Sequence, residues 1–236
     1  MDYLTGNLVD FMNHHFFLYF LLIMSIPVLA QLYLSSAYGK YTKMRSSTNL
    51  TGADVAQRIL DQNGLRNVRI ERTNGKLSDH YDPRTRTVRL SPSIHDGVSV
   101  AAKAVAAHEV GHAIQHATAY GPLKLRSMIV PVATVASRFG WILIMIGMFT
   151  AMFFLAEIGL IMMASLFLFQ IVTLPVEFNA SRRAMAQLTD MNLVYDRDER
   201  SGVRRVLNAA ALTYVAATLI SLLELIRIAA MINRRR

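Results

Sequence analysis

The feature that most constrains this chain is a long run of residues without charge near its N-terminus. Residues 11–39 contain no Asp, Glu, Lys or Arg, and a helix needs about 20 predominantly apolar residues to cross a bilayer. The preceding residues hold Asp2 and Asp10 but no basic residue, whereas a cleavable signal peptide begins with basic residues and has a shorter apolar core. We therefore predict a retained first transmembrane helix, in which Pro27 is tolerated.

Two further uncharged runs lie in the middle of the chain. Residues 139–156 and 158–176 are separated only by Glu157. Each run is close to the length that crosses a bilayer. The pattern predicts two membrane-spanning helices joined by a tight turn near Glu157, with Arg138 at the mouth of the first of them.

A fourth uncharged run, residues 206–223, is followed closely by Glu224 and Arg227. It predicts either a fourth transmembrane helix or a helix that is buried against the protein and ends as an anchor at the membrane surface. The expected fold class is therefore an α-helical integral membrane protein with three to four transmembrane helices and a small α+β part outside the membrane.

The composition agrees with a membrane protein and excludes other classes. Apolar residues make up 53% of the chain and charged residues only 17%, whereas about a quarter of the residues are charged in a typical soluble domain. The net charge of +9 comes from basic residues that flank the apolar runs, which favours a lipid bilayer over a nucleic acid as partner. The absence of cysteine excludes disulfides, thiol catalysis and Cys-based zinc sites.

The distribution of charge predicts how the chain is oriented. Residues 40–126 hold 14 Lys and Arg against 7 Asp and Glu, while the residues before the first uncharged run hold no Lys or Arg. Because basic loops stay on the cytoplasmic side, we expect the N-terminus outside and residues 40–126 in the cytoplasm. Two crossings return residues 177–205, which are also basic, to the same side. The C-terminal arginines conflict with this orientation if the fourth run spans the membrane.

The cytoplasmic segment begins with signals for a helix and a sheet. Thr51 is a suitable N-cap for a helix that runs through Asp61 and stops at Gly64. Alternating residues predict strands at 68–72, 77–81 and 87–90. The first two strands are separated by Asn74-Gly75, a strong hairpin signal, and the last two by Asp82-Pro83.

An alanine-rich helix follows Pro92, begins near Asp96 or Ser99, and runs to about Tyr120. It contains His108-Glu109-Val110-Gly111-His112. Positions i and i+4 of a helix share one face, so the two imidazoles can bind one zinc ion at about 2.0–2.1 Å. Glu109 lies beside this pair and can take a proton from the attacking water and pass it to the leaving amine.

The third zinc ligand has two candidates. His116 lies about 12 Å from His108 along a continuous helix, which is too far for one metal ion. Glu177 follows Pro175, which allows a new helix to start there. The two crossings between His112 and Glu177 bring the carboxylate back to the face of the membrane that holds the histidines. We therefore predict His108, His112 and Glu177 as ligands of Zn²⁺.

The chain resembles a known family at four blocks: residues 108–115 (HEVGHAIQ), 174–184 (LPVEFNASRRA), 77–83 (LSDHYDP) and 212–216 (LTYVA). These are similar to the YugP-type neutral zinc metallopeptidases of bacterial membranes, which in turn resemble the HtpX and Ste24 membrane proteases. The resemblance implies a gluzincin-like active site on the cytoplasmic side of the inner membrane. In those relatives an Asp four residues after the ligand glutamate supports a histidine ligand; here that position is Ser181, and Asn179 is an alternative partner.

Three further features have weaker signals. The strand at 77–81 precedes the metal helix and could hold an extended peptide by backbone hydrogen bonds. His80 on this strand could contact substrate or zinc, although a packing role is more common. Tyr214 is a candidate catalytic residue, as a donor to the oxyanion of the tetrahedral intermediate, and its alternative role is that of a tyrosine at the membrane interface. Other candidates for the donor to the oxyanion are Arg182, Arg183, Arg204 and Arg205.

The expected organisation has five parts: 11–39 as the first transmembrane helix, 40–126 as the metallopeptidase part, 127–176 as a transmembrane hairpin, 177–205 as a cytoplasmic helix with the third ligand, and 206–236 as the C-terminal apolar helix. The expected function is hydrolysis of peptide bonds in membrane proteins or peptides at the cytoplasmic face, and a quality-control role follows from the resemblance alone. The rivals are a membrane scaffold that binds zinc without catalysis and a zinc hydrolase of a non-peptide bond.

Overall fold

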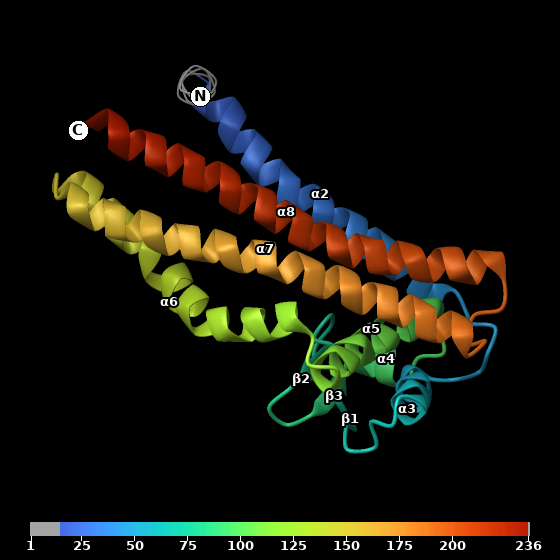
Figure 1. Cartoon of the computed structure of the whole chain (residues 1–236). Helices are drawn as coiled ribbons and strands as arrows, with labels where there is room; N and C mark the ends of the chain where they lie inside the picture. The colour runs from blue at the N-terminus through green and yellow to red at the C-terminus, as the bar shows by residue number, and fades with distance from the viewer. Residues whose placement is uncertain (1–14, 236) are drawn as a thin grey trace. The chain divides into compact units, whose positions relative to one another are not determined.

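The computed structural model describes residues 15–235. In chain order (Figure 1) its elements are α2 (Phe16–Lys43), α3 (Gly52–Gln62), β1 (Arg69–Arg72), β2 (His80–Asp82), β3 (Thr87–Leu90), α4 (Pro92–His95), α5 (Val100–Ala117), α6 (Gly121–Phe149), α7 (Phe153–Asp190) and α8 (Arg197–Arg235).

The chain divides into two compact units. The helical unit comprises the chain up to Gln31, Leu125–Leu174 and the chain from Thr213; the mixed unit comprises Leu32–Lys124 and Pro175–Leu212.

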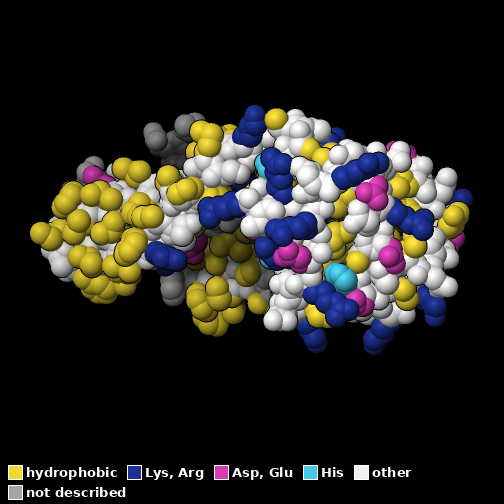
Figure 2. Space-filling view, turned by 90° about the horizontal axis from the view of Figure 1, so that it is seen from below, with side chains coloured by type: hydrophobic (Ala, Val, Ile, Leu, Met, Phe, Trp, Pro, Cys, Tyr) yellow, Lys and Arg dark blue, Asp and Glu magenta, His cyan; other side chains and the backbone are white. Residues whose placement is uncertain are grey.

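The helical unit has the surface of a protein that lies in lipid. Four helices of the described chain, α2, α6, α7 and α8, are long and apolar enough to cross a membrane. Large apolar side chains such as Phe17, Phe149 and Ile161 are more than two-thirds exposed, and yellow hydrophobic side chains cover the surface of this unit in Figure 2. The expected three to four membrane-spanning helices are thus matched by four candidates, and the uncharged run at 206–223 lies inside α8.

The turn between the two middle helices is not at Glu157, as the charge pattern predicted. The helix α6 ends at Phe149 and α7 begins at Phe153, so Glu157 lies in α7. Small residues explain this register. A Cβ atom on Gly147 would lie 2.4 Å from the backbone nitrogen of Ala156, and one on Gly159 would lie 2.9 Å from that of Ile144. In each pair the residue of α6 and the residue of α7 lie at nearly equal distances in sequence from the observed turn. Close packing of the two helices at these glycines therefore places the turn there.

A second correction concerns Pro175. The sequence predicted that a new helix starts there, but α7 continues through Pro175 as one helix of 38 residues. A proline inside a helix removes one backbone hydrogen bond. The Tyr120 hydroxyl lies 3.5 Å from the carbonyl oxygen of Pro175, and Gln115 donates to the next carbonyl, that of Val176. These contacts hold α7 against neighbouring elements at this position, and helices in membranes tolerate proline.

The sheet of the mixed unit has the order β1-β3-β2. β3 pairs in parallel with β1 and antiparallel with β2. The antiparallel pair confirms the turn expected around Asp82-Pro83. The hairpin expected at Asn74-Gly75 is wrong, because β1 and β2 are not neighbours. β3 is the most buried of the three strands, so it takes the centre, and β2 is left at an edge of the sheet.

The two predicted helices of the mixed unit form where their caps indicate. Thr51 caps α3 in a capping box with Asp54, and the Ser99 side chain accepts a hydrogen bond from Ala102 at the start of α5. Burial explains why α5 is rich in alanine, since 13 of its 18 residues are buried. It packs in one core with apolar residues from α3, β3, α7 and α8. The metal motif therefore lies on a helix that is enclosed by the rest of the unit.

A buried ion pair also holds α5. The Lys103 Nζ atom lies 2.9 Å from Glu199 Oε1, and both side chains are at most 1% exposed. Lys103 also donates to the carbonyl of Leu193, and Glu199 accepts from the Ser47 hydroxyl. This network joins α5 to the start of α8 and to the segment after α2. The lysine has partners for its charge, as a buried ammonium requires.

Replacing Lys103 by Met should destabilise the protein by about 3–5 kcal/mol, because the Glu199 carboxylate would be left buried without its counter-charge. The measurement is chemical or thermal unfolding in detergent. Arg72→Met is the matched control, since it breaks the Arg72–Asp96 pair at the surface of the same unit and should cost at most about 1 kcal/mol. Equal losses in the two variants would show that the buried pair does not stabilise the fold.

Candidate metal centre

Two histidines of α5 form one side of the candidate site. His108 and His112 are one turn apart, their ring centroids are 4.8 Å apart, and the rings meet edge to face. Their side chains are only 13% and 11% exposed. The two histidines thus share one face of α5, as their spacing predicted, and this face is mostly buried.

Glu177 of α7 forms the other side. Its Oε2 atom lies 3.3 Å from His108 Nε2 and 3.6 Å from His112 Nε2, and its side chain is 3% exposed. One ligand atom from each of the three residues lies within 4.8 Å of the others. Tetrahedral zinc with bonds of about 2.0–2.2 Å separates its ligand atoms by roughly 3.3–3.6 Å. The two distances from the carboxylate oxygen to the imidazole nitrogens match this separation, so the three residues could hold a zinc ion.

The remaining nitrogen of each imidazole has a partner that fixes the ring. His108 Nδ1 lies 3.2 Å from Ser181 Oγ, and His112 Nδ1 lies 3.0 Å from Gln115 Oε1. Gln115 is fully buried, and its amide nitrogen donates to the carbonyl of Val176 at 2.7 Å. Its Oε1 atom must therefore accept from His112 Nδ1, which leaves the lone pair of His112 on Nε2, toward Glu177.

The sequence left the supporting residue open between Asn179 and Ser181, and the structure uses both. Ser181 contacts His108 directly. Asn179 acts one step away, since its Oδ1 accepts from Gln115 Nε2 at 3.0 Å and from Arg183 Nε at 2.8 Å. Gln115 was not predicted as a supporting residue. Its position three residues after His112, on the same side of the helix, is the signal that could have found it.

Gly111 allows the two helices to approach closely. A Cβ atom at this position would lie 2.6 Å from the carbonyl oxygen of Ala180, which is closer than non-bonded atoms can lie. Only glycine therefore fits between His108 and His112 when α7 packs at this distance. The spacing that brings Glu177 to the histidines depends on this contact.

The site has the electrostatics of a cation-binding site. Burial acts to lower the pKa of His112, but the hydrogen bond to Glu177 and the charges of Glu109 and Glu177 outweigh it, so the pKa lies above its usual value. The two carboxylates thus favour a positive charge at His112.

Glu109 lies beside the cluster without being part of it. Its side chain is nearly buried, at 8% exposed, and it makes no hydrogen bond or ion pair to another residue of the described chain. Its oxygens are not fully enclosed, since they are absent from the buried unsatisfied atoms of the described residues. A carboxylate in this state is available to a water molecule or a substrate.

The other predicted residues lie apart from the cluster. His116 is not part of this cluster, and its Nδ1 lies 2.8 Å from the Tyr81 hydroxyl. His80 is exposed on β2, and its Nδ1 lies 2.8 Å from the Ser78 carbonyl oxygen. Tyr214 lies on α8 in the helical unit, outside the compact unit that holds His108, and its catalytic role stays a prediction.

Comparison with known proteins places the chain in a family. Residues 16–233 match the model of a family described as "Putative neutral zinc metallopeptidase". The chain belongs to this zinc metallopeptidase family. It is 48% identical over 198 residues to "Putative membrane protease YugP" of Bacillus subtilis (strain 168), a match that covers 84% of this chain and 88% of the relative. No solved structure matches.

The family match agrees with the resemblance seen in the sequence. A zinc metallopeptidase needs nitrogen and carboxylate ligands, and the cluster of His108, His112 and Glu177 is a group of such residues in the described chain. The relative is named as a membrane protease, which agrees with the four candidate membrane-spanning helices.

Replacing Gln115 by Met should weaken zinc binding by about 10- to 100-fold, because His112 loses the acceptor that fixes its ring. Zinc affinity of the purified protein, measured by competition with a chelator, is the test. Gln57→Met is the matched control, since Gln57 donates only to Asp61 on the exposed face of α3. Unchanged affinity in the Gln115 variant would exclude this supporting role.

Proposed function

We propose that the protein is a membrane-embedded zinc endopeptidase whose metal ion is bound by His108, His112 and Glu177. The observation that supports this most directly is the spacing of the three ligand atoms. His108 Nε2 and His112 Nε2 face one Glu177 oxygen at 3.3 and 3.6 Å, while neighbouring side chains hold both Nδ1 atoms. This arrangement supports a prepared metal site over a histidine pair in a core.

In the proposed reaction each protein group has a separate task. Zinc, when bound, polarises the peptide carbonyl and makes a water molecule more acidic. Glu109 takes the proton of the attacking water and later gives it to the leaving amine. The nearly buried site around Glu109 strengthens these electrostatic interactions, because little water screens them. Gln115 keeps His112 in the tautomer that leaves Nε2 available, and Ser181 contacts the Nδ1 atom of His108.

A peptide is the proposed substrate because of β2. This strand lies at an edge of the sheet, and it contacts α5, the helix that holds the two histidines. An edge strand can pair with an extended peptide through backbone hydrogen bonds. This supports the hydrolysis of peptide bonds over that of other bonds. The unpaired Glu109 carboxylate supports an enzyme over a zinc-binding scaffold, since a structural zinc site has no use for a free base.

Glu109→Gln should retain zinc and fold but lose peptidase activity by about 10²- to 10⁴-fold, the usual contribution of a general base. The measurement is turnover of a peptide library by the wild type and the variant at equal zinc content. Equal activity would remove Glu109 from the mechanism and favour the scaffold. Comparative membrane proteomics of cells with the wild type or with Glu109→Gln would then identify the substrates.

Glu177→Ala should lose its zinc during purification, whereas His116→Ala should retain it. A metal ion loses one of three protein ligands in the first variant, while the second removes only the partner of Tyr81. Metal analysis of both purified proteins is the test. A zinc-loaded Glu177→Ala beside a zinc-free His116→Ala would overturn the ligand assignment.

We place the active site on the cytoplasmic side of the bacterial inner membrane, where it could act in protein quality control. The charge bias of residues 40–126 supports this orientation. A single cysteine introduced at Thr73, in a chain that has none, should be protected from an impermeant thiol reagent in intact cells and react after lysis. Labelling in intact cells would mean that the topology is inverted.

A further inference from the structure

A groove separate from the metal ligands lies in the mixed unit between α7 and α8. Its volume is about 800 Å³. Its walls are largely apolar, with Phe178 and Met185 on α7 and Leu207 and Ala211 on α8. The other side chains that line it are Tyr120, Pro175, Asn179, Ser181, Arg182, Ala186, Thr189, Asp190, Arg204 and Asn208.

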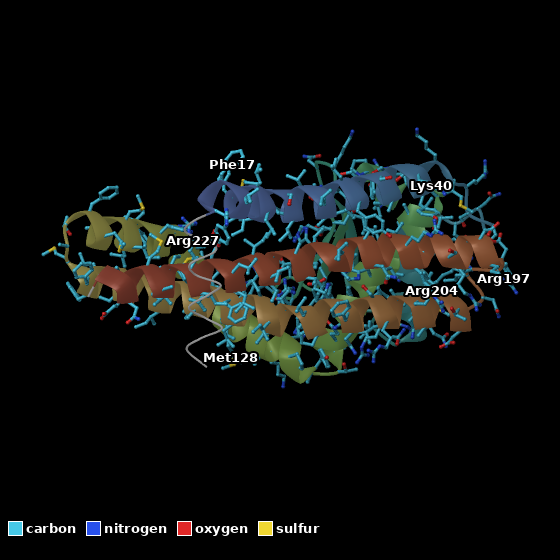
Figure 3. All side chains as sticks on the ribbon, turned by 90° about the horizontal axis from the view of Figure 1, so that it is seen from above. Phe17, Lys40, Met128, Arg197, Arg204 and Arg227 are labelled. Atoms are coloured by element: carbon cyan, nitrogen blue, oxygen red, sulfur yellow. The ribbon has the colours of Figure 1, made fainter. Side chains whose placement is uncertain are left out.

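Two arginines give the groove a positive charge. Arg182 comes from α7 and Arg204 from α8, and Figure 3 shows Arg204 where α8 runs beside α7. Both are exposed, and neither has a hydrogen-bond or ion-pair partner within residues 15–235. Asp190 is the one acidic residue among the lining residues. Two unpaired guanidinium groups from separate helices can bind one phosphate group, each with parallel N–H donors.

The position of the groove along the chain indicates where its ligand comes from. Pro175 and Ala211 line one end, and each lies within two residues of the boundary at which its helix passes into the helical unit. Arg182 and Arg204 are each seven residues beyond that end, or roughly 10 Å along a helix. The polar layer on each side of the hydrocarbon is about 5–8 Å thick, and an arginine side chain can reach back into it.

The chemistry of the walls favours a lipid over a peptide. The backbone groups of α7 and α8 are bonded within their helices, so the groove offers side chains but no free edge to the backbone of an extended peptide. An apolar wall beside two cations matches a molecule with an anionic head and a hydrocarbon chain. Basic pockets between membrane helices bind anionic lipid headgroups in this way.

We propose that this groove binds an anionic phospholipid, with the headgroup phosphate on Arg182 and Arg204 and the start of an acyl chain against Phe178, Leu207 and Ala211. The lipid would tie α7 to α8 on the side of α7 next to the metal centre, since Ser181 both lines the groove and contacts His108. The proposal does not depend on peptidase activity.

The test is native mass spectrometry of the full-length protein in detergent, titrated with phosphatidylglycerol or phosphatidylcholine. The wild type should bind phosphatidylglycerol at least tenfold more tightly than phosphatidylcholine. Arg182→Gln with Arg204→Gln should lose at least tenfold in affinity for phosphatidylglycerol and keep its zinc. Arg200→Gln with Arg205→Gln is the matched control, since it removes the same charge from exposed positions of α8 outside the groove, and it should change the affinity by less than twofold.

A second variant separates the groove from general surface charge. Asn208→Trp keeps every charge but fills the groove, and it should also lose at least tenfold in affinity. Equal losses in the two double variants, or full binding by Asn208→Trp, would overturn the proposal in favour of unspecific attraction to basic residues. Displacement of the lipid by equimolar inorganic phosphate or by an acidic peptide would likewise overturn it, since either would assign the groove to a soluble ligand.

Discussion

The carboxylate of Glu177 is the group around which the candidate metal centre is organised. A charged carboxylate that is 3% exposed is expensive to bury unless opposite charge or hydrogen bonds compensate it. The groups that face it are the Nε2 atoms of His108 and His112. In neutral His112 the Nε2 atom is an acceptor like the carboxylate, because its Nδ1 atom donates to Gln115 Oε1. A cation near these three groups, either a proton or a metal ion, therefore stabilises the buried carboxylate.

The same requirement explains the packing of α5 against α7. The carboxylate reaches the histidines only because Gly111 lets the helices approach, with the backbone of Ala180 at the place a side chain would occupy. Gln115 then joins the helices a second time, through His112 on one and Val176 on the other. Near the other end of α5, Lys103 forms an ion pair with Glu199. The metal helix is thus fixed at both ends by polar contacts within an apolar core.

The parts of this structure that could be predicted from sequence are those with local causes. The spacing of His108 and His112 places them on one helical face whatever surrounds the helix. Thr51 and Ser99 cap their helices through residues three positions away. The apolar runs that became α2, α6, α7 and α8 are set by composition, because only helices of that length satisfy their backbone within a bilayer.

The predictions that failed depended on partners distant in the chain. The turn before α7 is set by the contact of Gly147 with Ala156 rather than by the charge of Glu157. Asn74-Gly75 favours a hairpin locally, but burial of β3 inserts that strand between its two neighbours. Pro175 would end an isolated helix, whereas Tyr120 and Gln115 bond to carbonyls beside it. The spacing of Gln115 from His112 is a local signal, but its bond to the Val176 carbonyl is visible only once α7 lies across α5.

The residue at position 181, a serine beside His108, affects the net charge of the candidate metal centre. A hydroxyl fixes the imidazole through a neutral hydrogen bond, as the Gln115 amide does for His112. The anionic groups next to the histidines in the described chain are then Glu177 and Glu109. Their two charges equal that of one divalent cation, so a bound zinc ion leaves the nearly buried cluster close to neutral. A carboxylate at position 181 would add a third negative charge and would hold the metal ion more tightly, but it would also raise the energy needed to deprotonate water beside it. Two neutral partners therefore orient the histidines without competing with Glu109, the base of the proposed reaction.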